Sequence, residues 1–132
     1  MASLLKPALS LTVSAFIALG AFQAVAGDTN VKGSFTGASD HITTGGVQIV
    51  KTADGGAVVI LDSDFSLDGA PDPRVGFGKD GVFDGATDLG ALEKISGLQI
   101  YVVPASVNTD DFNEIYIWCL KFGVPLGVAE LS

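Results

Sequence analysis

The 132-residue sequence contains one cysteine, one histidine and one methionine, and the methionine is the initiator. Cys119 therefore has no partner for a disulfide bond within the chain. A blue-copper site needs two histidines and a cysteine, which this chain lacks. Zinc sites take three or four cysteine, histidine or carboxylate ligands, so Cys119 and His41 do not suggest one. The composition predicts neither a blue-copper nor a zinc site and directs attention to Cys119 itself.

Common enzyme motifs are also missing. No G-x-S-x-G segment of a hydrolase occurs. The string Gly76–Gly81 (GFGKDG) matches G-x-G-x-x-G, but the residues after it, VFDGATD, cannot form the helix whose N-terminus would face a pyrophosphate. We interpret this string as a strand followed by a β-turn. The sequence favours a protein that is not an enzyme in its own right.

The first 26 residues have the pattern of a secretory signal peptide. Lys6 precedes an apolar stretch from Ala8 to Phe22, and Ala24-Val25-Ala26 forms an A-x-A cleavage site. A spanning helix needs roughly 20 apolar residues, and this stretch is shorter. We therefore predict cleavage at Ala26 and export to the periplasm or the extracellular space. The mature protein is then a single domain, residues 27–132, without a stable membrane anchor.

The predicted mature domain is strongly acidic, with six basic residues against fifteen acidic ones and a net charge of −9. Such a charge repels nucleic acids and anionic membrane surfaces, so neither is expected as a partner. The acidic residues are scattered along the sequence, which indicates a solvated acidic surface and not an acidic tail.

The pattern along the mature chain is that of an all-β protein. Short β-branched and aromatic runs alternate with turn signals such as Asp54-Gly55-Gly56 and Asp80-Gly81, at intervals of about 8 to 12 residues. This spacing is typical of an antiparallel β-sandwich, jelly-roll or immunoglobulin-like, or of a partly open barrel. Within it, Thr87 to Gly97 is expected to hold one helical turn capped by Asp88.

The run Ile115–Gly123 (IYIWCLKFG) holds the only cysteine beside the only tryptophan. Alternate residues of a strand share a face, and both faces of this run are mainly apolar, which predicts a central strand. Buried cysteine behaves as a small hydrophobe, so Cys119 is expected in the core, and Trp118, Tyr101 and Tyr116 likewise. One face is predicted to carry Ile115, Ile117, Cys119 and Lys121, and the other Tyr116, Trp118, Leu120 and Phe122.

Seven of the scattered aspartates lie in two predicted loops, residues 62–72 and 80–88. Neither loop has the register of an EF-hand, and turn-forming Asp-Gly steps account for most of these residues. Loop carboxylates also bind calcium without a motif, so a calcium ion that bridges the two loops is one hypothesis. A contact with a partner is another. The residues considered for either role are Asp64, Asp68, Asp72 and Asp84.

Four segments, in this order and spacing, resemble the DM-13 domain family. Ile-Trp-Cys is the most characteristic feature of the match, which covers about 100 residues. The segments are GSFTGASDHITTGGVQIV (Gly33–Val50), GAPDPRVGFG (Gly69–Gly78), DLGALEKISGLQIYVVP (Asp88–Pro104) and IYIWCLKFGVPLGVAEL (Ile115–Leu131).

The resemblance implies a secreted all-β domain, of a kind often found beside haem-binding DOMON modules in animals. It also implies a redox or electron-transfer role for Cys119, as a bare thiol or as a haem ligand. The sequence departs from the family pattern at Ala70, inside the Gly-Pro-Asp turn, and at Leu126, where an aromatic residue is usual. Neither departure touches the cysteine strand.

Two functions stay open at this point. The first is an exported redox or electron-transfer module that works through Cys119, with Trp118, Lys121 and His41 as supporting residues. The second is a non-enzymatic β-sandwich that binds a protein or a small molecule through its acidic loops, with Cys119 in the core. A dimer linked by a Cys119–Cys119 disulfide is disfavoured because a mid-strand cysteine is not exposed, and we expect a monomer.

Overall fold

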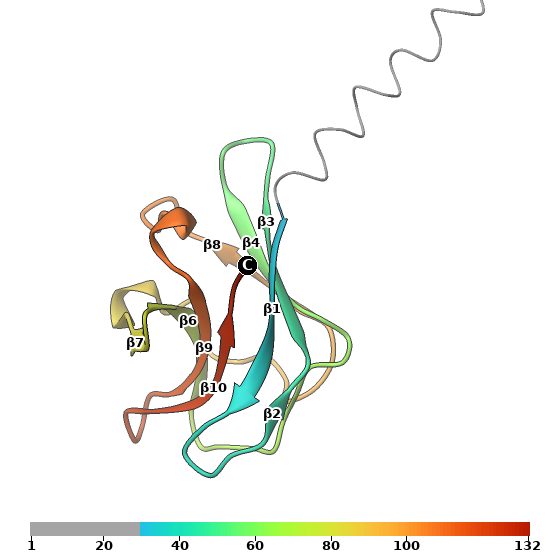
Figure 1. Cartoon of the computed structure of the whole chain (residues 1–132), viewed down its shortest axis with the longest axis vertical. Coiled ribbons are helices and arrows are strands. Elements are labelled where there is room, and N and C mark those ends of the chain that lie inside the picture. Colours follow the sequence, from blue (N-terminus) through green and yellow to red (C-terminus); the bar gives the residue numbers. More distant parts are fainter. Residues whose placement is uncertain (1–29) are drawn as a thin grey trace, which may run out of the picture.

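A computed structural model describes residues 30–132 of the chain (Figure 1). The predicted signal peptide and the domain start at residue 27 lie outside the described residues. No helix within residues 30–132 is long and apolar enough to cross a membrane.

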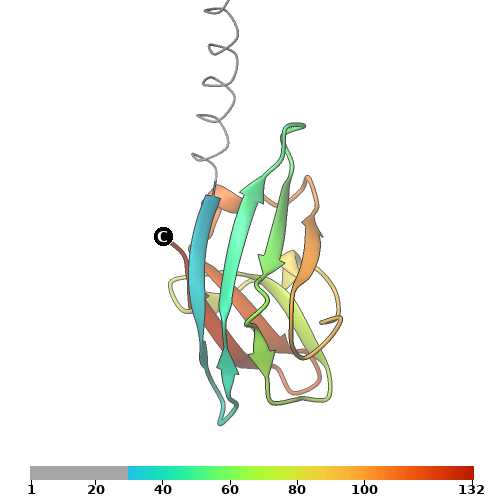
Figure 2. The same ribbon diagram turned by 90° about the vertical axis from the view of Figure 1, so that its right-hand side faces the viewer.

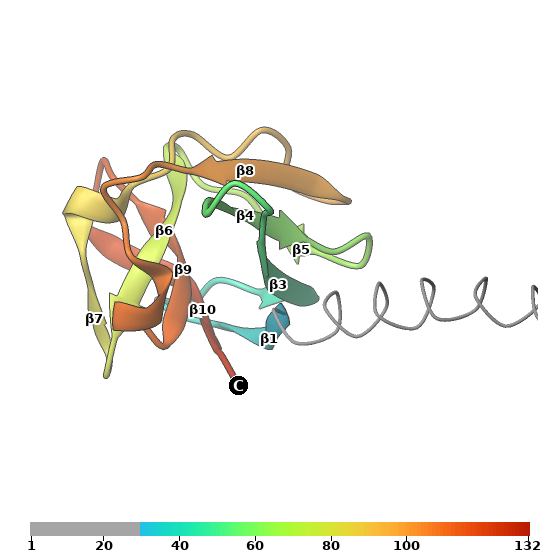
Figure 3. The same ribbon diagram turned by 90° about the horizontal axis from the view of Figure 1, so that it is seen from above.

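Eight strands form one continuous antiparallel sheet, in the order β7-β6-β9-β10-β1-β3-β4-β8. The sheet curls round on itself into a half-barrel, which is seen best from above (Figure 3). The predicted all-β antiparallel class is confirmed, and of the expected forms the partly open barrel describes it. The strands are β1 (Asn30–Gly37), β3 (Gly46–Lys51), β4 (Ala57–Leu61), β6 (Pro73–Lys79), β7 (Val82–Phe83), β8 (Gln99–Val103), β9 (Glu114–Cys119) and β10 (Val124–Glu130). A separate two-stranded sheet pairs β2 (Thr43–Thr44) with β5 (Ser66–Leu67).

The predicted hairpin turns are confirmed. Asp54 lies between β3 and β4, where its carboxylate accepts hydrogen bonds from the Thr52 hydroxyl at 2.5 Å and from the Gly56 N–H at 3.0 Å. Asp80 and Gly81 both have positive φ, 51° and 88°, and connect β6 to β7 in the tight turn that such angles favour. The GFGKDG string is therefore the end of a strand and a turn, as predicted.

The predicted helical turn at residues 87–97 is wrong. A single 3₁₀ turn, Gly85–Thr87, lies earlier and is capped by Asp84, whose carboxylate accepts the Ala86 N–H at 2.9 Å. The residues that follow form no helical turn: Leu89 N–H donates to the Val75 carbonyl of β6 at 2.7 Å, and Gly97 N–H donates to the Phe65 carbonyl at 2.9 Å. A second 3₁₀ turn, Thr109–Asp111, precedes β9.

The same segment, residues 88–97, connects the two margins of the curled sheet. On one side Leu92 N–H donates to the Pro73 carbonyl of β6 at 2.8 Å. On the other side Glu93 N–H donates to the Tyr101 hydroxyl of β8 at 2.9 Å. The open side of the half-barrel is thus spanned by an extended chain instead of a ninth strand.

The core fills the concave side of the sheet. Strand alternation places one set of side chains inside: Val47 and Ile49 of β3, Val59 and Leu61 of β4, Val75 and Phe77 of β6, and Ile115, Ile117 and Cys119 of β9. These residues come from strands on both arms of the curl, which is why one sheet suffices to enclose a core.

The two ends of the described chain lie together. Lys32, near the start of β1, exchanges two backbone hydrogen bonds with Ser132, at 2.9 and 3.3 Å. The C-terminus lies next to β1 in the middle of the sheet (Figure 1).

Candidate functional site

Cys119 is the last residue of β9, a central strand between β6 and β10. Its register partners are Pro73 on β6 and Val124 on β10. The side chain points into the core with Ile115 and Ile117, as the alternation predicts, and it is 1% exposed. Among the described residues Cys119 is a free cysteine. No hydrogen bond to its sulfur is found within residues 30–132.

The strand ends immediately after Cys119, and this changes the positions of the next three residues. Gly123 has φ of +65°, which few side chains tolerate, and its N–H donates to the Cys119 carbonyl at 2.8 Å to close a turn. Lys121 is therefore not on the Cys119 face, and the alternation predicted for residues 120–122 is wrong. Instead Leu120 and Phe122 are exposed, at 49% and 64%.

The turn is held against the preceding loop. Leu120 N–H donates to the Asp72 carbonyl at 3.0 Å, so the chain at Asp72 lies beside the end of β9. The Lys121 ammonium lies 5.7 Å from the centre of the Phe122 ring. The surface next to Cys119 is therefore the exposed apolar turn of Leu120 and Phe122, with the Lys121 ammonium near the Phe122 ring.

The outer face of β9 carries a small aromatic cluster, made of Phe83, Tyr116 and Trp118. Phe83 stacks on Trp118, and Tyr116 meets both rings edge-on. Tyr116 is buried, as is Tyr101 on β8, so the expectation for the two tyrosines is confirmed. Trp118 is only half-buried, because β7 covers one side of it and it faces away from the main core.

Tyr116 is also part of a polar contact at the edge of this cluster. Its hydroxyl donates to Glu114 at 3.2 Å, and the same carboxylate accepts the Gly81 N–H at 3.0 Å. Burial, together with the nearby Glu114 charge and this hydrogen bond, raises the pKa of Tyr116 to about 12. The phenol therefore stays protonated through the neutral range.

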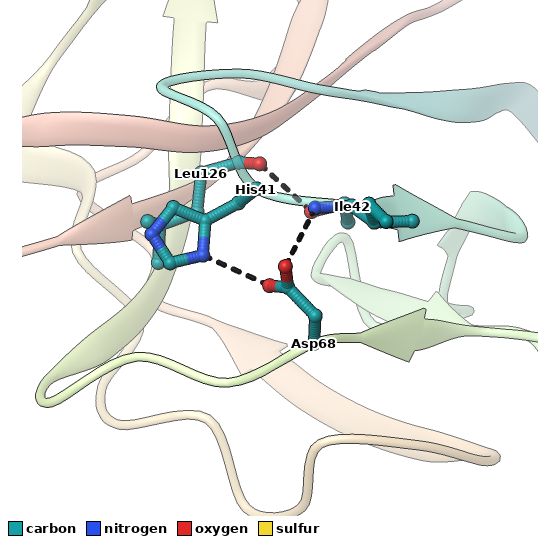
Figure 4. Close-up of polar contacts among 5 residues, drawn as sticks. His41, Ile42, Asp68 and Leu126 are labelled. Carbon is teal, nitrogen blue, oxygen red and sulfur yellow. Dashed lines mark hydrogen bonds and ion pairs between the residues drawn. The ribbon is translucent and has the colours of Figure 1, made fainter.

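His41 is fixed by Asp68 and not by Cys119 (Figure 4). Its Nδ1 lies 2.8 Å from one Asp68 oxygen, and the Ile42 N–H donates to the other at 3.0 Å. These contacts, the backbone bond first, lower the pKa of Asp68 below its ordinary value. The loop is joined to β10 by the Leu126 carbonyl, which accepts the Thr43 hydroxyl at 2.7 Å.

A haem does not fit beside Cys119. The iron would need a sulfur reachable from a pocket wide enough for the macrocycle, whereas this sulfur is in the packed core. Two of the clefts on the described surface have volumes of about 820 and 260 Å³. Neither is lined by Cys119 or His41. The Cys119–His41 ligand pair is therefore not assembled.

The aspartates of the two loops have local partners. Asp64 accepts the Gly46 N–H at 2.9 Å, Asp72 contacts Arg74 at 3.2 Å, and Asp84 caps the first 3₁₀ turn. No group of three or more His, Cys, Asp or Glu side chains within residues 30–132 is arranged to hold a metal ion. The calcium hypothesis gains no support from this arrangement.

The aromatic cluster at Phe83 was not predicted from the sequence. The Asp80-Gly81 turn puts Phe83 opposite Gly78 on β6. Glycines at 76 and 78 leave the space that Phe83 and Tyr116 occupy. An aromatic residue opposite glycine across a tight hairpin is the signal that could have revealed the cluster.

The domain is thus an all-β half-barrel, with one buried cysteine at the end of a central strand of its antiparallel sheet. Residues 34–131 match the family model described as Electron transfer DM13, and the chain belongs to that family. The match confirms the resemblance drawn from the sequence. No curated protein and no solved structure matches the chain.

Proposed function

We propose that this DM13 domain is an exported electron-transfer module in which Cys119 undergoes the redox change. The observation that carries the proposal is the position of Cys119. Cys119 is 1% exposed, yet Leu120 and Phe122, which follow it within three residues, form an exposed apolar turn. A redox group in this position is shielded from solvent and still lies directly behind a surface that a partner can touch.

Burial suits electron transfer better than thiol exchange. Thiol–disulfide exchange needs a thiolate that can attack another sulfur directly, and a resolving cysteine, and both are missing for a lone core thiol. In the proposed role Cys119 gives one electron to the oxidised one-electron carrier of a partner protein and its proton to solvent. It recovers one electron from the reduced one-electron carrier of a second partner protein and one proton from solvent, which restores the thiol.

The surface round the turn is apolar, with charges of both signs beside it. Asp72, whose carbonyl accepts the Leu120 N–H, pairs through its carboxylate with Arg74, and the Lys121 ammonium lies near the Phe122 ring. A partner with an apolar contact patch and a polar rim would match the apolar turn and the paired charges beside it. Leu120 and Phe122 are the residues that would touch it.

Protein-film voltammetry of the purified protein tests the proposal. We expect a reversible wave that disappears in Cys119→Ala, with the folded state of that variant checked by thermal melting. Phe122→Ala should keep the wave on the electrode, because the turn serves partner contact and not the redox change. A wild-type protein without a wave, or a wave that survives in Cys119→Ala, contradicts the proposal.

Export is part of the proposal and has its own test. Expression of the full-length chain in its host, followed by fractionation and mass spectrometry, should find a protein that starts at Gly27 outside the cytoplasm. A full-length protein in the cytoplasm would contradict this part alone.

A second function is favoured by one observation, the packing of Cys119 among the seventeen buried residues of the core cluster. The cysteine is then a small core side chain, and the domain is a non-enzymatic module that binds a protein or a small molecule through its acidic loops. Under this alternative Cys119→Ala keeps the biological effect of the domain in its host, whereas Asp68→Asn or Asp72→Asn weakens it without unfolding the protein.

A further inference from the structure

One margin of the sheet is an unpaired strand. β8 is the last strand in the sheet order and pairs with β4 alone within residues 30–132. Figure 2 shows it as the orange strand at the right-hand margin. In an antiparallel pair, every second residue of such a strand directs its N–H and C=O away from the neighbour. The outer side of β8 therefore offers a row of backbone groups for a further strand.

The convex face of this margin is apolar. Leu98, Ile100 and Val102 are 53%, 51% and 75% exposed. They continue on β4, where Val58 lies opposite Val102 and Ile60 lies opposite Ile100, both half-buried. The apolar surface of β4 therefore continues over β8 and reaches the unpaired edge of the sheet.

The margin is also free of charge. No charged residue occurs from Ile95 to Val107, although the whole chain has a net charge of −8. Edge strands are usually protected from pairing by lysine, proline or a bulge, and β8 has none of these within its five residues. The opposite margin, β7, has two residues and is flanked by Lys79, Asp80 and Asp84.

We infer that β8 pairs with β8 of a second copy of this chain. A two-fold axis through the edge generates an antiparallel strand pair, and with the axis at Tyr101 it places Ile100 opposite Val102 of the second copy. The two apolar margins then join into one surface across both molecules.

A second copy is chosen as the occupant because the two-fold pairing sets this uncharged, apolar edge against an identical one. Two molecules of this acidic protein repel each other over most of their surfaces. The uncharged stretch from Ile95 to Val107 is a place where they meet without opposing carboxylates. The expectation of a monomer rests on the position of Cys119, which bears only on a disulfide and not on this edge.

The dimer should be weak. One strand from each copy makes a small interface, and interfaces below about 1,200 Å² are typical of transient association. Pairing is therefore expected at high protein concentration and not in dilute solution. This inference is independent of the redox proposal, since β8 does not contact the Cys119 turn in the sheet order.

Sedimentation velocity of the purified protein, with reductant present, tests the inference. We expect the sedimentation coefficient to rise from the monomer toward the dimer value as concentration approaches the millimolar range. Val102→Lys should raise the dissociation constant by about tenfold or more, because the two-fold brings the new charge against an apolar side chain. Val82→Lys, at a residue 69% exposed on the opposite margin, is the matched control and should dimerise like the wild type.

A double variant tests the register. Ile100→Glu combined with Val102→Lys places opposite charges across the proposed pair twice, so it should recover dimerisation that Val102→Lys alone loses. A wild type that stays monomeric at every concentration overturns the inference, and so does equal dimerisation of Val102→Lys and Val82→Lys. A double variant that stays monomeric overturns the proposed register.

Discussion

Phe83 stacks on Trp118 with ring centroids 4.4 Å apart and ring planes inclined by only 12°. The two residues come from β7 and β9, strands that are not neighbours in the sheet, since β6 lies between them. β7 therefore packs over the outer face of β9, the strand that carries Cys119.

Phe83→Ala should uncover this face. We expect the unfolding free energy to fall by about 2 kcal/mol, since a half-buried aromatic contact is lost. Trp118 is the only tryptophan, so its fluorescence should shift to longer wavelength as water reaches the indole. Val82→Ala, one residue away and 69% exposed, should change stability by no more than about 0.5 kcal/mol. Equal losses in both variants would show that the stack contributes nothing.

Gly78→Ala should be destabilising for a steric reason. A Cβ at this position would overlap the Tyr116 ring and lie 2.6 Å from the Val82 carbonyl oxygen. Because the oxygen belongs to the backbone of the β6–β7 turn, relief requires the turn to move, and a loss of about 1–3 kcal/mol is expected. Chemical denaturation measures it. Gly85→Ala is the control, since a Cβ there meets nothing within 4 Å, and a comparable loss in that variant would refute the explanation.

Tyr116 should make the folded state sensitive to alkali. Its pKa is about 12 in the folded protein and roughly 10 in the unfolded chain, so the folded state holds the proton more tightly. This contribution to stability is complete below pH 10 and is lost as pH rises toward 12, by about 2 kcal/mol. Denaturant unfolding across this range should show the loss in the wild type. Tyr116→Phe should lack that part of the pH dependence, and identical curves for the two proteins would contradict the assignment.

Asp68 should titrate below the ordinary range of aspartate. The Ile42 N–H is the larger cause of the lowered pKa, and His41 is the smaller one. In His41→Ala we expect the Asp68 midpoint to rise only part of the way to its ordinary value, because the backbone donor remains. Carbon-detected NMR of the carboxyl group measures both midpoints. The stability that Asp68 contributes is present at pH values above its pKa in the unfolded chain. It is lost as the pH falls through its lower pKa in the folded protein. A midpoint unchanged by His41→Ala would remove the imidazole from this explanation.

Local chemistry allowed much of the fold to be predicted. Alternation along Ile115, Ile117 and Cys119 gives the inward face of β9, and Asp-Gly steps give two hairpin turns. The prediction fails where a tertiary contact decides. Residues 89–92 make their backbone–backbone hydrogen bonds to β6 instead of forming a helical turn, and the alternation after Cys119 stops because Gly123 closes a turn.

The polar contacts of the site could not be predicted from spacing. His41 and Asp68 are 27 residues apart, and nothing in the sequence between them indicates that they meet. Trp118 was expected in the core because its strand is apolar on both sides. The burial of Trp118 is only partial because it depends on how much of the indole the two-residue strand β7 covers. Only the packed structure defines this.

The hydrogen-bonded pair Lys32 and Ser132 determines how this domain would respond to tension. β1 and β10 are antiparallel neighbours, and their outer ends carry the two ends of the described chain. A force that pulls these ends apart loads the interstrand bonds one after another, from Lys32 inward, and not all together. The domain would therefore unzip under a small force, although its core on either side of β1 and β10 is well packed.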